Sequence, residues 1–410
     1  MRHIDKDYIV AGIPPSRLGV GRLMAYLVEQ NQNDFSIIYP NIKYPDSDLE
    51  TLIRRVSCLE VFKQCFIYLH SKVINKFYLR NEIASLKGQN VILIHPQTIG
   101  LENVTKIIEN NNVFLYLMDC SFFCVKSYNH IEKSFQPCFL CVGGNYEFAK
   151  LNNCKPFPEK YKLSTNVQFL EMLQKSSNKI TFLVQNSSQG DLVKKHFGEK
   201  TRVLKIGMFA TDFIENSTNV KNKNEIDEEY NFDFVYHGAV SEAKGLLYTL
   251  NIASKLNQFS FLIPAPYEKC KKIIDKQSFK NELANVTFLN MSWETGLREY
   301  VINSKVILCP SLWSAPIEGS LIKSFIFNGV VALVPAKYSF VNDLPESIYC
   351  KLDDNSLDRE AKKLTELIEN EAYRNCLQAN AQNWIYSFLN DNKQIIEKLK
   401  TATAKEMYEP

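Results

Sequence analysis

The sequence lacks any uninterrupted apolar run of about 18 residues, the length that a helix needs to cross a bilayer. Its opening stretch, MRHIDKDYIVAGIPP, holds too short an apolar segment for an export signal. We therefore expect a cytoplasmic protein. The slight excess of Lys and Arg over Asp and Glu permits peripheral contact with the inner membrane face without requiring it. The net charge of +3 is too small to indicate a nucleic-acid-binding protein.

Other signatures are also missing. The loop after the first apolar stretch holds Gly19 and Gly21, but Met24 stands where the dinucleotide fingerprint G-x-G-x-x-G has its third glycine. We find no internal repeat and no low-complexity segment. What is present is a chain of 410 residues with a hydrophobic share of 45%, which is ordinary for a globular protein of one to three domains.

Short, β-branched-rich apolar runs alternate with helical patterns along the chain. In the first half, the runs that we assign to strands span residues 8–11, 35–39, 90–95, 113–118, 180–184 and 202–206. In the second half they span residues 232–236, 259–263, 286–289, 306–309 and 330–334. This alternation predicts an α/β protein with two doubly wound, Rossmann-like domains that face each other across a central cleft.

The polar and charged stretch of residues 216–230 is the clearest linker. It separates a first domain, residues 1–215, from a second domain, residues 231–385. Residues 386–410 read as a helical tail, which we expect to pack back on the first domain.

The second domain is organised around residues 303–336, which read as strand, loop, helix and strand. Glu318, Gly319 and Ser320 lie where the loop turns into the helix. Ligands of open parallel sheets bind at this edge, because free backbone N–H groups and the helix dipole attract an anion there. A neighbouring carboxylate can accept hydrogen bonds from hydroxyl groups. A phosphorylated sugar offers both an anionic phosphate and hydroxyl groups.

A second loop of this domain runs from Gly238 to Gly245, after the strand at residues 232–236. Gly238 allows the turn, and Lys244 stands at the helix start, where its ammonium can reach a diphosphate held by backbone N–H groups. The alternative is a surface lysine in a turn capped by Ser241. The presence of the Glu318 loop in the same domain favours the binding interpretation.

These motifs resemble those of the B-fold (GT-B) glycosyltransferases, in the large sugar-nucleotide-dependent group that builds bacterial surface polysaccharides. The donor domain of that family carries G-R-x4-K-G, which Gly238, Lys244 and Gly245 match while Ala239 replaces the arginine. The resemblance implies donor binding by Gly238, Lys244, Glu318, Gly319, Ser320 and Ser324. The family's E-x7-E element has a second glutamate eight residues after the first, where this chain has Ile326; counted back from Gly329, that place falls on Ser324.

In the first domain, the loop with Gly19 and Gly21 resembles the family's glycine loop, which faces the donor phosphates, and a simple tight turn is the open alternative. The resemblance implies that Arg22, or Arg17, supplies positive charge there.

The run LYLMDCSFFC resembles the family's strand that ends in His-Asp. Asp119 is kept, and Met118 occupies the place of the histidine that contacts the transferred sugar. His95 ends the neighbouring predicted strand and could face the cleft, although a hydrogen-bonded structural role is the alternative. The resemblance implies that Asp119 and His95 lie near the reacting centre.

The chain has eleven cysteines, which we expect to be reduced thiols. Cys138 and Cys141 form a C-x-x-C pair, and Cys124 and Cys154 flank it. Four thiolates would suit a structural, tetrahedral zinc ion. Packing as small hydrophobic side chains is the open alternative.

We therefore expect a hexosyltransferase that moves a sugar from a nucleotide-diphosphate donor to a polysaccharide or lipid-linked glycan in cell-surface polysaccharide synthesis, such as O-antigen or capsule. Catalysis would be electrostatic and would require no cofactor. A B-fold sugar epimerase or phosphorylase is one alternative. A non-catalytic, two-domain nucleotide-sugar-binding protein is another, because Ala239, Met118 and Ser324 depart from the family's pattern.

Overall fold

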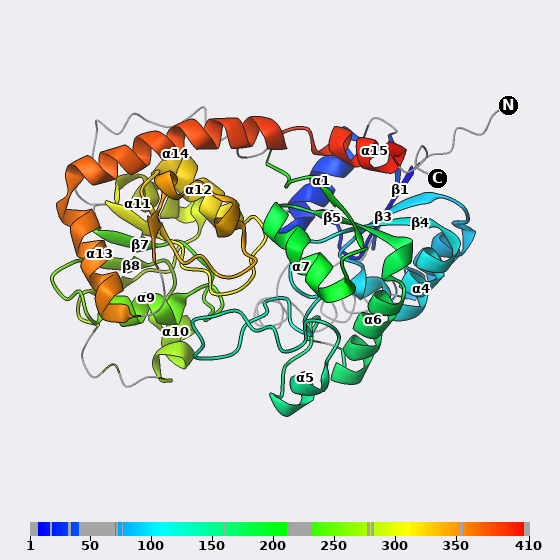
Figure 1. The fold of residues 1–410 in the computed structure, drawn as a ribbon, viewed down its shortest axis with the longest axis horizontal. Coiled ribbons are helices and arrows are strands. Elements are labelled where there is room, and N and C mark those ends of the chain that lie inside the picture. The colour runs from blue at the N-terminus through cyan, green and yellow to red at the C-terminus, as the bar shows by residue number, and fades with distance from the viewer. Residues whose placement is uncertain are drawn as a thin grey trace, which may run out of the picture.

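The computed structural model describes residues 7–16, 19–31, 34–40, 70, 73–75, 77–159, 161–210, 213, 232–276, 279, 283–352 and 356–405. Two lobes lie side by side, each built on a parallel six-stranded sheet with helices around it (Figure 1). The predicted α/β class with two doubly wound, Rossmann-like domains is confirmed. The predicted linker, residues 216–230, and Arg17 lie outside the described residues.

The first sheet has the strand order β2-β1-β3-β4-β5-β6, and all its pairs are parallel. Its strands are β1 (Asp7–Ala11), β2 (Phe35–Ile38), β3 (Asn90–Ile94), β4 (Asn112–Tyr116), β5 (Ile180–Val184) and β6 (Arg202–Lys205). The central strands are buried on both faces, which explains their continuous apolar runs. The helices around this sheet are α1 (Val20–Gln30), α4 (Leu101–Asn110), α5 (Glu147–Leu151), α6 (Leu163–Lys175) and α7 (Ser187–Phe197).

The second sheet has the order β12-β11-β10-β7-β8-β9 and is also parallel. Its strands are β7 (Phe234–Tyr236), β8 (Phe261–Ile263), β9 (Val286–Phe288), β10 (Val306–Leu308), β11 (Val331–Leu333) and β12 (Cys350–Lys351). Its helices are α9 (Leu246–Ala253), α10 (Tyr267–Ile274), α11 (Leu297–Asn303), α12 (Gly319–Phe327) and α13 (Leu357–Glu369). The predicted strand–loop–helix–strand unit of residues 303–336 corresponds to β10, α12 and β11.

Two helices at the end of the described chain connect the lobes again. The long α14 (Glu371–Asn392) runs from the second lobe to the first, where α15 (Ile395–Lys405) lies close to α1 (Figure 1). Ile385 and Leu389 pack into the core of the second domain. Ile395 and Leu399 pack into the core of the first domain. The exact domain limits stay a prediction. None of the described helices is long and apolar enough to span a bilayer.

Candidate active site

A hollow of about 600 Å³ lies between the two domains. We call it the cleft pocket. It opens where strands of both sheets end, since Gln185 directly follows β5 and His237 directly follows β7. This is the edge at which open parallel sheets bind ligands. Its walls include Gly19, Arg22, Met118, Gln185, Phe213, His237, Trp293, Gly319, Ser320 and Lys323.

Four of the predicted site residues line the cleft pocket: Gly19, Arg22, Gly319 and Ser320. Gly19 and Arg22 come from the start of α1 in the first domain, and Gly319 and Ser320 form the first turn of α12 in the second. The predicted neighbour Gly21 is buried, and a Cβ there would collide with Ser16. Gly21 therefore allows close packing of the loop on itself.

Arg22 and Lys323 bring positive charge to opposite sides of the cleft pocket. The Arg22 guanidinium lies 4.7 Å from the ring centroid of Phe213, and the Lys323 ammonium lies 4.5 Å from that of Trp293. Aromatic faces hold both cations by cation–π attraction. The pocket thus combines two cations and one carboxylate, Glu294, with the N-terminus of α12. The cations and the helix terminus attract an anion.

Lys244 and Glu318, which are 74 positions apart in sequence, form an ion pair beside the cleft pocket. The Ser311 hydroxyl donates to the other oxygen of the Glu318 carboxylate at 2.6 Å. The Lys244 ammonium lies 4.8 Å from the ring of Tyr128, which belongs to the first domain, and 4.6 Å from the ring of Trp313. The side chains of Lys244 and Glu318 are 14% and 11% exposed. The carboxylate therefore neutralises the lysine that the sequence assigned to the diphosphate.

The backbone around this ion pair depends on Gly245. Its φ is +82°, and a Cβ on it would lie 2.1 Å from the Pro310 carbonyl oxygen. Glycine is the residue that adopts this conformation without steric cost. It brings the Lys244 loop directly against the loop that follows β10.

Ser324 lies below the surface of the site, and Gly238 is half-buried outside the lining of the cleft pocket. Ser324 is fully buried, and its hydroxyl oxygen lies 2.9 Å from Nδ1 of His237. Burial lowers the pKa of His237 to about 3, so this imidazole is neutral at physiological pH. A Cβ on Gly238 would collide with the hydroxyl of Tyr236. These contacts support the walls of the cleft pocket.

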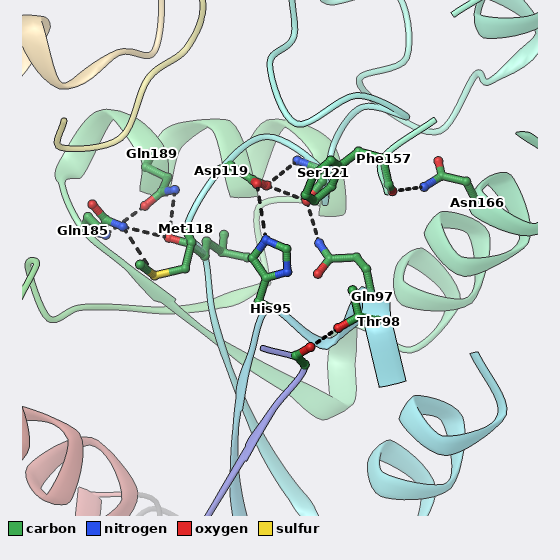
Figure 2. A network of polar contacts seen from close by, with 12 residues as sticks. His95, Gln97, Thr98, Met118, Asp119, Ser121, Phe157, Asn166, Gln185 and Gln189 are labelled. Carbon is green, nitrogen blue, oxygen red and sulfur yellow. Dashed lines mark hydrogen bonds and ion pairs between the residues drawn. The ribbon is translucent and has the colours of Figure 1, made fainter. Parts of the chain in front are cut away.

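Asp119 and His95 meet at the end of the first sheet, as Figure 2 shows. His95 Nε2 lies 3.9 Å from an Asp119 carboxylate oxygen. Asp119 also accepts a hydrogen bond from the Ser121 backbone N–H at 2.8 Å, which holds the carboxylate in place. His95 is 8% exposed, and its Nδ1 has no hydrogen-bond partner among the described residues. The carboxylate thus lies near one ring nitrogen, beyond hydrogen-bond distance, while the other ring nitrogen is buried.

Met118 is adjacent to Asp119 and lines the cleft pocket. Its sulfur lies 3.6 Å from the side-chain nitrogen of Gln185 (Figure 2). The Gln185 side-chain oxygen accepts a hydrogen bond from the Ile317 backbone N–H at 3.2 Å, across the domain boundary. The pair of Asp119 and His95 therefore lies directly beside the surface at which the two domains touch.

The four cysteines of the predicted zinc site lie near one another, on loops on either side of α5. The thiols of Cys124 and Cys141 share a hydrogen bond, which raises the pKa of Cys124 and lowers that of Cys141. Within the described part of the chain, no three or more Cys, His, Asp or Glu side chains are arranged to hold a metal ion. The zinc site stays a prediction.

Sequence reasoning missed the aromatic residues of the site. Tyr128, Trp293 and Trp313 were not assigned a role, and neither was Lys323. The chain has three tryptophans, and two of them lie on loops that follow β9 and β10. A tryptophan in the segment that follows a predicted strand was the available signal.

No protein-family model matches the chain, and no curated protein sequence does. Several solved structures do match. HepE of Anabaena, in complex with UDP and glucose, is 12% identical with a TM-score of 0.58, over 97% of this chain and 100% of HepE. Sucrose-phosphate synthase from Thermosynechococcus elongatus is 10% identical with a TM-score of 0.57, over 97% and 100% of the two chains.

A glycosyltransferase from Rickettsia africae is 11% identical with a TM-score of 0.56, over 98% of this chain and 99% of that chain. Identities this low establish the fold and not the activity. The chain therefore has the two-domain B fold of these proteins, and the predicted resemblance is confirmed at the level of fold.

Proposed function

We propose that this B-fold protein is a glycosyltransferase and that the cleft pocket binds its nucleotide-diphosphate sugar. One observation carries the proposal: the pocket joins a helix N-terminus to cations from both domains, Arg22 and Lys323. A diphosphate is the part of a sugar nucleotide that needs such a site.

The N-terminus of α12 is prepared for a ligand. Glu318 is the N-cap residue of α12, but its carboxylate pairs with Lys244 and Ser311 and makes no cap hydrogen bond. The backbone N–H groups of the first turn, at Gly319 and Ser320, are therefore left for the phosphate oxygens. We assign the diphosphate to this turn.

The same positive charge would drive the reaction. In glycosyl transfer, the acceptor oxygen forms a bond to the anomeric carbon while the bond from that carbon to the diphosphate oxygen breaks. Arg22, Lys323 and the amides of α12 would stabilise the negative charge that develops on the leaving diphosphate. This arrangement needs no metal cofactor. We assign the pair of His95 and Asp119 to the reacting centre, where the imidazole would receive the proton of the acceptor hydroxyl.

The finer assignments rest on the sequence resemblance and on the similar structures. HepE is described in complex with UDP-glucose, as well as with UDP and glucose. We therefore propose uridine as the nucleoside and a hexose as the transferred sugar. A cytoplasmic location and a polysaccharide or lipid-linked acceptor for cell-surface glycan synthesis are part of this proposal.

The test is nucleotide binding followed by turnover. We expect UDP and UDP-glucose to raise the melting temperature of the wild-type protein. Arg22→Ala and Lys323→Ala should each weaken UDP binding by about tenfold, which is the loss of one charge-assisted contact to a phosphate. Lys362→Ala, at an exposed position on α13, is the matched control and should bind as the wild type does.

Two results would count against the proposal. If UDP, GDP and ADP all leave the melting temperature unchanged, the cleft pocket is no nucleotide site. If UDP binds but UDP-glucose is never consumed in the presence of extracted glycolipids, the protein is a non-catalytic binder of nucleotide sugars.

A further inference from the structure

A second hollow, of about 550 Å³, also lies between the domains, and the proposed donor site does not use it. We call it the lysine pocket. Its first-domain wall is formed by the loops around Tyr128 and Phe157, and its second-domain wall by the loop at Ala243 and by α10 with Lys272. We propose that the lysine pocket binds the acceptor saccharide and that this saccharide carries an anionic group. The inference rests on the proposed glycosyltransferase function.

The position of the lysine pocket relative to the reacting groups is the first argument. Its residue Tyr128 has its ring 4.8 Å from the Lys244 ammonium. Its residue Phe157 packs edge-on against His95, with the ring centroids 5.4 Å apart. The ring of Tyr128 therefore separates the lysine pocket from the Lys244–Glu318 ion pair. The ring of Phe157 separates it from the proposed base. The donor occupies the cleft pocket, so the two substrates would approach the reacting centre from two hollows.

The charge in the lysine pocket is the second argument. Four lysines and three glutamates line it, and the Lys276 ammonium pairs with Glu132 at 2.8 Å and with Glu242 at 2.6 Å. Lys126 donates to a backbone carbonyl. Among the described residues, Lys126, Lys155 and Lys272 have no carboxylate within ion-pair distance.

With Glu132, Glu242 and Glu159 in the lining, the four lysines leave one positive charge in excess. The hydrogen bond from Lys276 lowers the pKa of Glu132, and Lys126 and Lys272 also contribute to that lowered pKa. Lys155 comes from the first domain and Lys272 from the second. An anion held between them would cancel their repulsion and favour contact between the domains.

The neutral lining is the third argument for a saccharide rather than a bare ion. Asn152, Asn153, Ser127 and Ser241 offer amide and hydroxyl groups, and Tyr128 supplies an aromatic face. Hydroxyl-rich ligands need such donors and acceptors at close spacing. Either a phosphate or a carboxylate on the sugar ring would form ion pairs with the lysines.

The experiment measures binding of small probes to the wild-type protein saturated with UDP, so that the donor site is filled. Ligand-observed NMR titrations would compare glucose 6-phosphate, glucuronic acid, glucose and inorganic phosphate. We expect one or both anionic sugars to bind about tenfold more tightly than glucose or phosphate, which is the gain from one or two charge-assisted contacts. Comparison of the two anionic sugars distinguishes a phosphate from a carboxylate.

Charge reversal then locates the site. The variant Lys155→Glu/Lys272→Glu should lose the preference for the anionic sugar by about tenfold or more, while its affinity for UDP stays within about twofold of the wild type. The matched control is Lys175→Glu/Lys271→Glu, which reverses one exposed lysine in each domain outside the pocket. The control should behave as the wild type does.

Each contrary result has one meaning. If glucose binds as tightly as both anionic sugars, or if the charge-reversal variant keeps the preference, the lysine pocket does not bind an anionic acceptor. If phosphate alone binds as tightly as glucose 6-phosphate, the site takes an ion and no saccharide. If the wild-type protein does not bind UDP at all, the proposed function itself is wrong.

Discussion

At the scale of single residues, burial sets the protonation state of two histidines. His196 is 3% exposed, and the Gly143 backbone N–H donates to its Nδ1 at 3.1 Å. Burial lowers the pKa of His196 to about 4. A proton on Nδ1 would place two donors against each other, because the Gly143 N–H already occupies that nitrogen. Like His237 in the cleft pocket, His196 is therefore held as a neutral imidazole.

This predicts that the protein loses stability as the pH falls from about 6.5 to about 4. In that range the unfolded chain takes up a proton at His196 that the folded chain does not, so the free energy of unfolding falls by up to about 1.4 kcal/mol per pH unit for this group. Urea unfolding at several pH values would compare the wild type with His196→Gln. The variant should show the shallower slope between pH 6.5 and 4.5.

Above about pH 7.5 the histidine is neutral in both states, so the two stability curves should run parallel there. That range is the internal control. Equal slopes between pH 6.5 and 4.5 would show that the folded protein accommodates a protonated His196.

At the scale of elements, the N-terminus of α7 is capped by a residue of the other domain. Asn186 caps α7 from within the first domain by accepting from the Gln189 backbone N–H. The backbone N–H groups of Ser187 and Ser188 donate instead to the Asp343 carboxylate of the second domain, at 2.6 and 3.0 Å. A helix N-terminus attracts a carboxylate through its dipole and its free donors. This contact therefore holds the two lobes together.

We predict that Asp343→Ala weakens the closed arrangement of the domains. Loss of these two backbone hydrogen bonds, and of a third from the Ser188 hydroxyl, should cost on the order of 2 kcal/mol. Amide hydrogen exchange at Ser187 and Ser188 should rise about tenfold or more, since local opening is governed by that free energy. Asp358→Ala removes an exposed carboxylate that pairs with Lys255 in the same domain, and it should leave the exchange at α7 unchanged. If amide exchange at Ser187 and Ser188 is unchanged in Asp343→Ala, water replaces the carboxylate at the N-terminus of α7 without a loss of stability.

At the scale of the whole molecule, the path of the chain ties the second domain back to the first. Trp384 of α14 packs against Phe325 of α12, with ring centroids 5.2 Å apart. Beyond α14, Ile395 and Leu399 are fully buried against the first domain. Lys400 also pairs with Asp34 of the first domain at 2.9 Å. Figure 1 shows α14 crossing from one lobe to the other and α15 ending beside α1. The helix α15 is thus part of the first domain's core.

We predict that Leu399→Ala destabilises the first domain by about 2–5 kcal/mol, as a buried leucine that is cut back to alanine leaves a cavity. Thermal unfolding would show the loss, and Thr401→Ala, at an exposed position two residues further along α15, is the control. If Leu399→Ala and Thr401→Ala melt alike, α15 contributes little to the first domain.

Local pattern in the chain was sufficient for the architecture and for part of the site. The strands of both sheets were predicted except for β12. Buried parallel strands are short apolar runs, which can be recognised from the local sequence alone. The loop before α12 was recognised for the same reason. The two-residue β12 and the helix α6 were missed, since β12 is too short to show a period and α6 carries polar residues at several positions.

The side-chain partners became visible only in the folded molecule. Lys244 and Glu318 were both placed at the donor site, but their mutual ion pair was not foreseen, and neither was the ring of Tyr128 over Lys244 from the opposite domain. Arg22 and Lys323, which face the cleft pocket from separate domains, are brought together in the same way. Periodicity and turn chemistry act over a few residues, whereas contacts between loops of two domains depend on how both sheets are packed.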